Sequence, residues 1–499
     1  MASVSAIEGG AGTATARGRN VVLLQVAVAF FVLLKIVYAV MVPPNGDEAY
    51  YWLWGGHLQL SYYDHAPMVG WVSGLARMVG GWTPAALHLP AFATFLVLAF
   101  TLHRAARWLA PEDPTWFSWL GLAVLCASPL FNALTTLNYP DHLLICFSAL
   151  ALLLMGRYLN DVLAGGARLP DLYLGAFFLG LAGLSKYSAV FLALGLVVAL
   201  IAAPRLRKLF RSPHLYAAGA LTFIITLPVL VWNAEHRFAS LELHALDRLN
   251  ADATGFTPVL LLRAVVLSVL MLSPFVVVAF GRFVFGRPAS ADQAGLILLG
   301  RGTAVISTLV LLPLAAWGAF GSQVSPHWLV LSFLPFMLVA PLYLRSRWMI
   351  GLHLGWGALI NTVAVLYYVL APLPTELFGI RDYEAAHTFA KGQLASKVAR
   401  LASETGAVAI IDRDYDSLSQ LAFGLGDDSL VTDLGGRIDR LTGRTFGPAD
   451  AGKDMLLVGP TSDADERFER FDPLPPVVVH RLGRVIATYE IWLARGFKP

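Results

Sequence analysis

The feature that most constrains this chain is a series of long apolar runs separated by short polar stretches. A helix needs about 20 consecutive apolar residues to cross roughly 30 Å of hydrocarbon. Hydrophobic residues make up 57% of the 499 residues, and charged residues only 14%. Since a soluble domain carries about 25% charged residues, a lipid environment explains this composition better than one large buried core. The sequence therefore predicts an all-α protein that crosses a membrane many times.

Eleven runs are apolar enough to be interpreted as membrane spans. Before the first run, residues 1–20 are polar and rich in Ala, Gly and Thr, so we expect a disordered cytoplasmic tail. The first run is long for a signal-peptide core and has no cleavage site behind it, so we expect it to be retained. Only Lys186 divides the fifth run from the sixth. The predicted spans are 21–42, 84–109, 116–132, 139–159, 172–186, 187–203, 214–233, 258–284, 299–320, 327–344 and 348–371.

The distribution of basic residues predicts an orientation. If the N-terminus is cytoplasmic, fifteen Lys and Arg side chains fall on the inside and only four on the outside. Positively charged loops tend to stay in the cytoplasm, so this bias favours the eleven-span topology. The C-terminus is then expected outside the cytoplasm. The four outside residues are Arg77, Lys186, Arg237 and Arg248.

The last part of the chain, residues 372–499, differs in composition, with 19 acidic and 15 basic residues and no run of membrane length. Short apolar stretches at 407–411, 455–458 and 477–480 are typical of strands, and 383–404 is typical of a helix. We therefore expect a small soluble α/β domain here, on the extracytoplasmic side.

The first outside loop, residues 43–83 of the transmembrane domain 21–371, concentrates acidic and aromatic side chains. Asp47 lies one helical turn before two tyrosines, so one short interfacial helix could present the carboxylate and the rings together. Pro67 is expected to open a second amphipathic helix that ends near a pair of glycines. The loop also contains Glu48, Tyr50, Tyr51, Trp52, Trp54, His57, Tyr62, Tyr63, Asp64 and His65.

The rings of this loop have an ordinary explanation, because Tyr and Trp gather at the headgroup level of membranes. That explanation does not account for adjacent carboxylates at the edge of a membrane, where unpaired charge is costly. A positioned carboxylate can take the proton of a hydroxyl. In sugar transfer such a base activates the acceptor oxygen, while a phosphate leaving group needs little protonation. The loop therefore favours a sugar transferase with a carboxylate base.

The string DEAYYWLWGGHLQLSYYDHAP, residues 47–67, resembles the first-loop signature of bacterial ArnT-like and protein O-mannosyltransferase-like glycosyltransferases of the family 39 type. These enzymes share the GT-C fold. The resemblance implies a polyprenyl-phosphate sugar donor and action on the periplasmic or luminal face. Further matching pieces are TTLNYPDHLL (135–144), GLAGLSKYSAVF (180–191), LPVLVWNAEHRFASLELH (227–244), PHWLV (326–330) and SQLAF (419–423).

The resemblance also implies roles for residues of this loop. Asp47 matches the acid to which the catalytic role is assigned, and Glu48 is a second candidate catalytic residue beside it. Asp64 and His65 match an acidic–basic pair that is Glu-Lys in ArnT-like enzymes. With His in place of Lys, we expect His65 to hydrogen-bond the donor phosphate or, alternatively, to ligate a metal. A divalent metal ion held by Asp64 and His244 is one alternative, with fewer ligands than zinc usually has. Tyr62 and Tyr63 are expected to contact the donor.

Three residues outside the loop complete the predicted site. Asp141 begins the fourth span and is predicted to be catalytic, because intramembrane acids are usually functional; alternatively it caps the helix after Pro140. Lys186 is predicted to bind the donor phosphate as a point charge, or alternatively to extend to the interface. His327 opens a span at the outer boundary and is expected to contact the donor headgroup, or to belong to the interfacial belt.

We therefore predict an inverting glycosyltransferase of the bacterial inner membrane. It would transfer a sugar from a polyprenyl-phosphate donor to a hydroxyl of lipid A, lipopolysaccharide, another glycolipid or a protein. The chain has no Walker or Rossmann motif, so no nucleotide cofactor is expected. The alternative is a flippase that moves a lipid-linked sugar without chemistry. Transporters place charges near the midplane, and Lys35 alone is too little to build such a pathway, so the enzyme is favoured.

Overall fold

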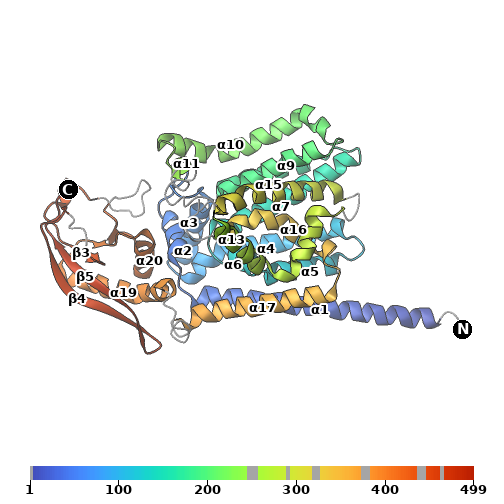
Figure 1. The fold of residues 1–499 in the computed structure, drawn as a ribbon. Coiled ribbons are helices and arrows are strands. Elements are labelled where there is room, and N and C mark those ends of the chain that lie inside the picture. The colour runs from blue at the N-terminus through green and yellow to red at the C-terminus, as the bar shows by residue number, and fades with distance from the viewer. Residues whose placement is uncertain are drawn as a thin grey trace. The chain divides into compact units, whose positions relative to one another are not determined.

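The computed structural model divides the chain into two compact units, which are described separately (Figure 1). The first unit comprises Met1–Ile36, Asp64–Ala66 and Ala91–Val363, and the second comprises Val37–Tyr63, Pro67–Pro90 and Ala364–Pro499. The first-loop helices thus group with the C-terminal part of the chain, whereas the sequence suggested a boundary at residue 372. The described residues are 4–243, 257–287, 293–316, 326–371, 383–434, 446–460 and 466–499.

The first unit is built from apolar helices, and α1, α4 and α17 each contribute to both units. Helix α1 begins at Val4, so the structure extends it into the segment for which the composition predicted disorder. The helices are α1 (Val4–Met41), α4 (Pro84–Leu109), α5 (Pro114–Ala127), α6 (Pro129–Leu134), α7 (Pro140–Leu163), α8 (Leu169–Ser185), η1 (Tyr187–Ala189), α9 (Val190–Ala202), η2 (Arg207–Arg211), α10 (Pro213–Glu235), α11 (Ala239–Glu242), α13 (Pro258–Leu272), η4 (Pro274–Val276), α14 (Val277–Phe285), α15 (Ala294–Ala316), η6 (Pro326–Leu329), α16 (Val330–Tyr343) and α17 (Arg347–Leu370).

Every predicted span coincides with an apolar helix or helix pair among the described residues. Six helices are long and apolar enough to cross a membrane, and four shorter apolar helices have 10–17 residues. The six are Asn20–Met41, Pro84–Leu109, Pro140–Leu163, Pro213–Glu235, Ala294–Ala316 and Arg347–Leu370. The number that span the bilayer stays a prediction.

The predicted span 258–284 is a broken pair of helices in the structure. The chain bends by 87° between α13 and the η4–α14 segment. Pro274 has no N–H to continue the helix, and Ser273 before it has a φ of 105°. The carbonyls of the last turn of α13 accept hydrogen bonds from the side chains of Ser128 and Trp356 at 3.1 and 3.0 Å. These bonds let an irregular backbone persist among apolar helices.

Helices α7, α8, α9 and α15 pack together in the first unit (Figure 1). Small residues allow α9 and α15 to approach closely. A Cβ atom on Gly195 would lie 2.5 Å from the backbone nitrogen of Thr303, and one on Gly302 would lie 2.4 Å from the carbonyl oxygen of Gly195. Close backbone approach at small residues is a common basis of helix association in membranes.

The second unit combines two short helices of the first loop with the C-terminal α/β domain. Helices α2 (Gly46–Trp54) and α3 (Met68–Gly80) match the two helices predicted for the loop. The C-terminal domain contains α19 (Tyr383–Thr405), β1 (Ile410–Ile411), α20 (Tyr415–Leu425), β2 (Val431–Thr432), η7 (Pro448–Asp450), β3 (Met455–Val458), β4 (Arg470–Arg481) and β5 (Arg484–Arg495).

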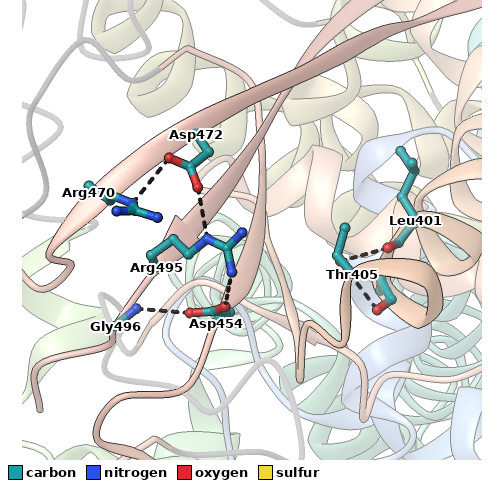
Figure 2. Close-up of polar contacts among 8 residues, drawn as sticks. Leu401, Thr405, Asp454, Arg470, Asp472, Arg495 and Gly496 are labelled. Atoms are coloured by element: carbon teal, nitrogen blue, oxygen red, sulfur yellow. Dashed lines mark hydrogen bonds and ion pairs between the residues drawn. The ribbon is translucent and has the colours of Figure 1, made fainter.

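These strands form one mixed sheet in the order β2-β1-β3-β5-β4. Strands β1, β2 and β3 are parallel, whereas β4 and β5 form a long antiparallel hairpin beside β3. Near the open end of the hairpin, Arg495 donates to Asp472 and Asp454 at 2.8 Å each (Figure 2). Arg495 therefore links β5 to β4 and to the chain just before β3.

Candidate active site

Asp47 lies in the first turn of α2, where its position follows from the capping of this helix. The side chain of Asn45 accepts a hydrogen bond from the backbone N–H of Glu48 at 3.0 Å, and the Glu48 carboxylate lies 3.4 Å from the Asn45 N–H. This capping box defines the start of the helix. Asp47 is partly exposed between these two residues, and the positive end of the helix dipole favours its carboxylate charge.

Glu48 has a different environment from its neighbour. It is fully buried, and its second carboxylate oxygen lies 3.8 Å from Nε2 of the buried His88. The His88 ring stacks on Tyr38 with centroids 5.8 Å apart. Glu48 therefore caps its own helix and faces the start of α4. Its carboxylate is buried and supports the structure of the loop, and it is not exposed for a reaction.

The aromatic rings of the first loop are mostly core residues. Trp52, Trp54 and Tyr62 are fully buried. The Trp54 and Tyr62 rings stack with centroids 4.0 Å apart, and the Tyr62 hydroxyl donates to the Trp54 carbonyl at 3.0 Å. Tyr62, predicted to contact the donor, thus supports the loop from inside, whereas Tyr63 is partly exposed. Neither an interfacial belt nor a substrate contact explains the buried rings.

In the first unit, the structure pairs two of the predicted site residues. Nζ of Lys186 lies 2.8 Å from both carboxylate oxygens of Asp141. Asp141 is in the first turn of α7. Lys186 directly follows α8, and its backbone is extended between α8 and η1. Asp141 is 1% exposed and the Lys186 side chain 13%. The sequence predicted both residues, but not that they form an ion pair.

Elsewhere in the first unit, a buried lysine holds the segment that leads into α7. Lys35 is 1% exposed, and its Nζ donates to the carbonyl of Asn132 at 2.8 Å and to the hydroxyls of Thr135 and Thr136 at 2.7 and 3.0 Å. Both hydroxyls donate in turn to backbone carbonyls of α6. The three acceptors satisfy the three N–H groups of the ammonium.

This arrangement predicts that removing the hydroxyl acceptors lowers the free energy of unfolding more than removing the Lys35 charge does. A Thr135→Val/Thr136→Val variant should lose at least about 3 kcal/mol of stability, because a buried ammonium loses two hydrogen bonds. Lys35→Met should cost less, since replacing a buried charge by an apolar side chain of similar volume is often neutral. Thermal unfolding of both variants in detergent would test the order, and the reverse order would contradict it.

Three further predicted site residues, all with polar side chains, belong to the first unit. Asp64, His65 and His327 are partly exposed in the first unit. His244 lies outside the described residues. Within the described ranges, no three His, Cys, Asp or Glu side chains form a group that could hold a metal. The metal ion predicted at Asp64 and His244 therefore stays a prediction.

Comparison with known proteins adds three findings. A family model described as dolichyl-phosphate-mannose-protein mannosyltransferase matches residues 64–232. The lipid A galacturonosyltransferase RgtD of Rhizobium johnstonii is 25% identical over 396 residues, which cover 77% of this chain and 78% of RgtD. Two crystal structures of ArnT from Cupriavidus metallidurans, apo and bound to undecaprenyl phosphate, match with TM-scores of 0.58 and 0.61. At 16% identity they cover 95% and 94% of this chain and 97% and 98% of their own.

The chain has the ArnT fold. The predicted resemblance to ArnT-like GT-C glycosyltransferases is thereby confirmed, as is the fold class of many apolar helices with a small C-terminal sheet domain. The three findings together support a membrane glycosyltransferase of the ArnT and RgtD type. The family match includes Asp141 and Lys186 but begins after Asp47.

A cluster that the sequence did not predict ties the first loop to the C-terminal domain. Asp428 follows α20 and lies 2.9 Å from Nε2 of His57 and 3.6 Å from Nη1 of Arg77. The Arg77 guanidinium also stacks 4.1 Å from the Trp82 ring. These residues are far apart in sequence, and no local pattern indicates that they meet.

The pKa of Asp428 gives this cluster a testable pH dependence. Burial raises this pKa, but the hydrogen bond from His57 and the charges of His57 and Arg77 outweigh burial and hold it below the ordinary 3.8. The contribution of ionised Asp428 to stability is thus complete above pH 3.8 and is lost as the pH falls through the lowered pKa. Asp428→Asn should lose less stability than wild type on acidification from about pH 6 to about pH 3. Equal losses, measured by thermal unfolding, would contradict this prediction.

Proposed function

We propose that this protein is an inverting glycosyltransferase that takes a sugar from a polyprenyl-phosphate carrier and adds it to a hydroxyl of an envelope glycolipid. The observation that carries the proposal is the Asp47 carboxylate, partly exposed on a capped helix start, in a chain with the ArnT fold. Glu48, buried and turned toward the cap and His88, is assigned to supporting this helix instead of to chemistry.

In the proposed reaction, Asp47 takes the proton of the acceptor hydroxyl. The acceptor oxygen forms a bond to the anomeric carbon as the bond from that carbon to the phosphate oxygen breaks. The polyprenyl phosphate leaves with the bonding electrons, and the configuration at the anomeric carbon inverts. Because a phosphate leaves readily, no second carboxylic acid is required, in contrast to glycoside hydrolysis.

Lys186 is proposed to bind the donor phosphate, with Asp141 positioning it. An ammonium has three N–H donors, and the two oxygens of Asp141 accept two of them. The third can reach a phosphate oxygen, where a fixed positive charge stabilises the developing negative charge. His65, Tyr63 and His327 remain proposed contacts of the donor headgroup, since all three are partly exposed. Support for a polyprenyl carrier comes from the ArnT structure with undecaprenyl phosphate.

The proposed acceptor is lipid A or a related glycolipid, which is what the name of RgtD states for that relative. A protein acceptor is the second candidate, because the matching family model describes protein mannosyltransferases. We place the reaction on the periplasmic face of the bacterial inner membrane, with the N-terminus cytoplasmic, on the basis of the distribution of Lys and Arg.

The test is transfer by the purified full-length protein in detergent. The protein would be supplied with a panel of polyprenyl-phosphate sugars and an envelope lipid extract, and the products measured by mass spectrometry. A sugar-sized mass gain on a glycolipid identifies donor and acceptor together. If no donor gives transfer, and the protein in liposomes moves the lipid-linked sugar across the bilayer, the proposed enzyme is wrong and the protein is a flippase.

A further inference from the structure

The acid-bearing helix α2 is seated on helix α20 of the C-terminal domain, more than 360 residues later in the chain. Leu53 of α2 is fully buried in the same apolar core as Leu394 of α19 and Leu418 of α20. On the neighbouring face of α2, Trp52 packs against Phe423, with ring centroids 6.2 Å apart. One face of α2 is thus built into the C-terminal domain.

The contacts of α20 continue to the start of α2, where Asp47 lies. Nε2 of Gln420 donates to the carbonyl oxygen of Pro44 at 3.1 Å, and Gln420 is 7% exposed. Pro44 precedes Asn45, the residue that caps α2. The same Nε2 of Gln420 also donates to the hydroxyl of the buried Thr388 at 3.4 Å, which further restrains this amide.

A second contact constrains the same end of the helix. A Cβ atom on Gly46, the residue before Asp47, would lie 2.6 Å from Cβ and Cγ of Asp416 in the first turn of α20. Real Cβ atoms do not approach other atoms so closely, so only glycine allows the two helix starts to meet. The backbone on both sides of the capping residue is therefore held by α20.

We infer that Gln420 is a positioning residue for Asp47, and that the C-terminal domain serves the transfer reaction by fixing the start of α2. This inference rests on the proposed function, because it assumes that Asp47 is the base. A general base must lie within hydrogen-bond reach of the hydroxyl proton, and a shift of about 1 Å can cost about a hundredfold in rate. Gln420 acts on the Pro44 carbonyl and, through the cap, on the direction of the Asp47 carboxylate.

The first experiment compares Gln420→Met with two controls in the full-length protein. Gln393→Met removes an amide that donates to the His480 carbonyl in the same domain, and Ser419→Ala removes a buried hydroxyl of α20 that donates to the Tyr415 carbonyl. Gln420→Met should lower kcat by about 10- to 100-fold without changing the KM for the polyprenyl-phosphate sugar. The controls should keep kcat within about twofold.

A matched steric experiment tests the same contact without touching Gln420. Gly46→Ala should lower kcat because its methyl group separates the starts of α2 and α20. Asp416→Gly removes the three atoms nearest to that methyl group, so Gly46→Ala/Asp416→Gly should recover most of the lost kcat. A merely structural role would move the melting temperature together with kcat in both variants, whereas a positioning role lowers kcat of Gly46→Ala by more than its loss of folded protein explains.

The outcomes separate this inference from the proposed function. If wild type transfers no sugar, the proposed function fails. If wild type and the controls transfer sugar and Gln420→Met matches them in kcat, the inference is wrong. It is also wrong if kcat of Gln420→Met falls only in proportion to the folded fraction, or if Asp416→Gly fails to rescue Gly46→Ala. A fall in kcat at constant donor KM, with rescue, supports it.

Discussion

Replacing Asp47 by Asn is expected to lower the rate of sugar transfer by about 10²- to 10⁴-fold while leaving folding and donor binding nearly unchanged. The amide has the size of the carboxylate but cannot accept the hydroxyl proton. Asp47 is partly exposed in the first turn of α2, and Asn is well tolerated near helix starts, so little stability should be lost. Single-turnover transfer and equilibrium binding of the donor would measure the two effects separately.

A matched control is Asp113→Asn. Asp113 is also a helix-start carboxylate, accepting a hydrogen bond from the N–H of Trp116 at 3.1 Å, and Asn can make the same bond. This variant should transfer sugar at the wild-type rate. Near-wild-type turnover of Asp47→Asn would remove Asp47 from the role of base, and Asp64 of the same loop would become the next carboxylate to test.

The local architecture of the first loop could be predicted from the sequence, because local signals define it. Asp47 lies one helical turn before two tyrosines, and Pro67 precedes the second helix, so α2 and α3 lie where these signals predicted them. Helix α19 and strand β3 also lie where short local patterns of the sequence predicted them, over 383–404 and 455–458.

Features that depend on distant partners could not be predicted. Tyr62 looks like a ligand contact in the sequence, but its stacking on Trp54 depends on how the loop folds back. The contact of Gln420 with Pro44 joins residues 376 positions apart, which no periodicity indicates. The bend at Ser273 was also missed, although Pro274 offered a signal, because the apolar run continues through it. The SQLAF resemblance pointed to α20 without saying what it touches.

The pairing of Lys186 with Asp141 leads to the second large effect. Asp141 is 1% exposed and depends on the ammonium for its charge partner. Lys186→Met would leave a buried carboxylate without this partner, and breaking a buried pair in this way costs about 3–5 kcal/mol. The single variant should therefore unfold at a lower temperature and also lose donor binding. From this variant alone, a lost phosphate contact could not be told from a damaged fold.

The double variant Lys186→Met/Asp141→Asn separates the two roles. Removing both charges avoids the uncompensated carboxylate, so thermal stability in detergent should return to within about 1 kcal/mol of wild type. If Lys186 binds the phosphate, affinity for the polyprenyl-phosphate sugar should stay reduced by about 10-fold or more, since a charge-assisted hydrogen bond contributes about 1.5–3 kcal/mol. Wild-type affinity in the stable double variant would show instead that the pair only joins α7 to the end of α8. Recovery of the fold without recovery of binding would identify Lys186 as the residue that holds the leaving phosphate.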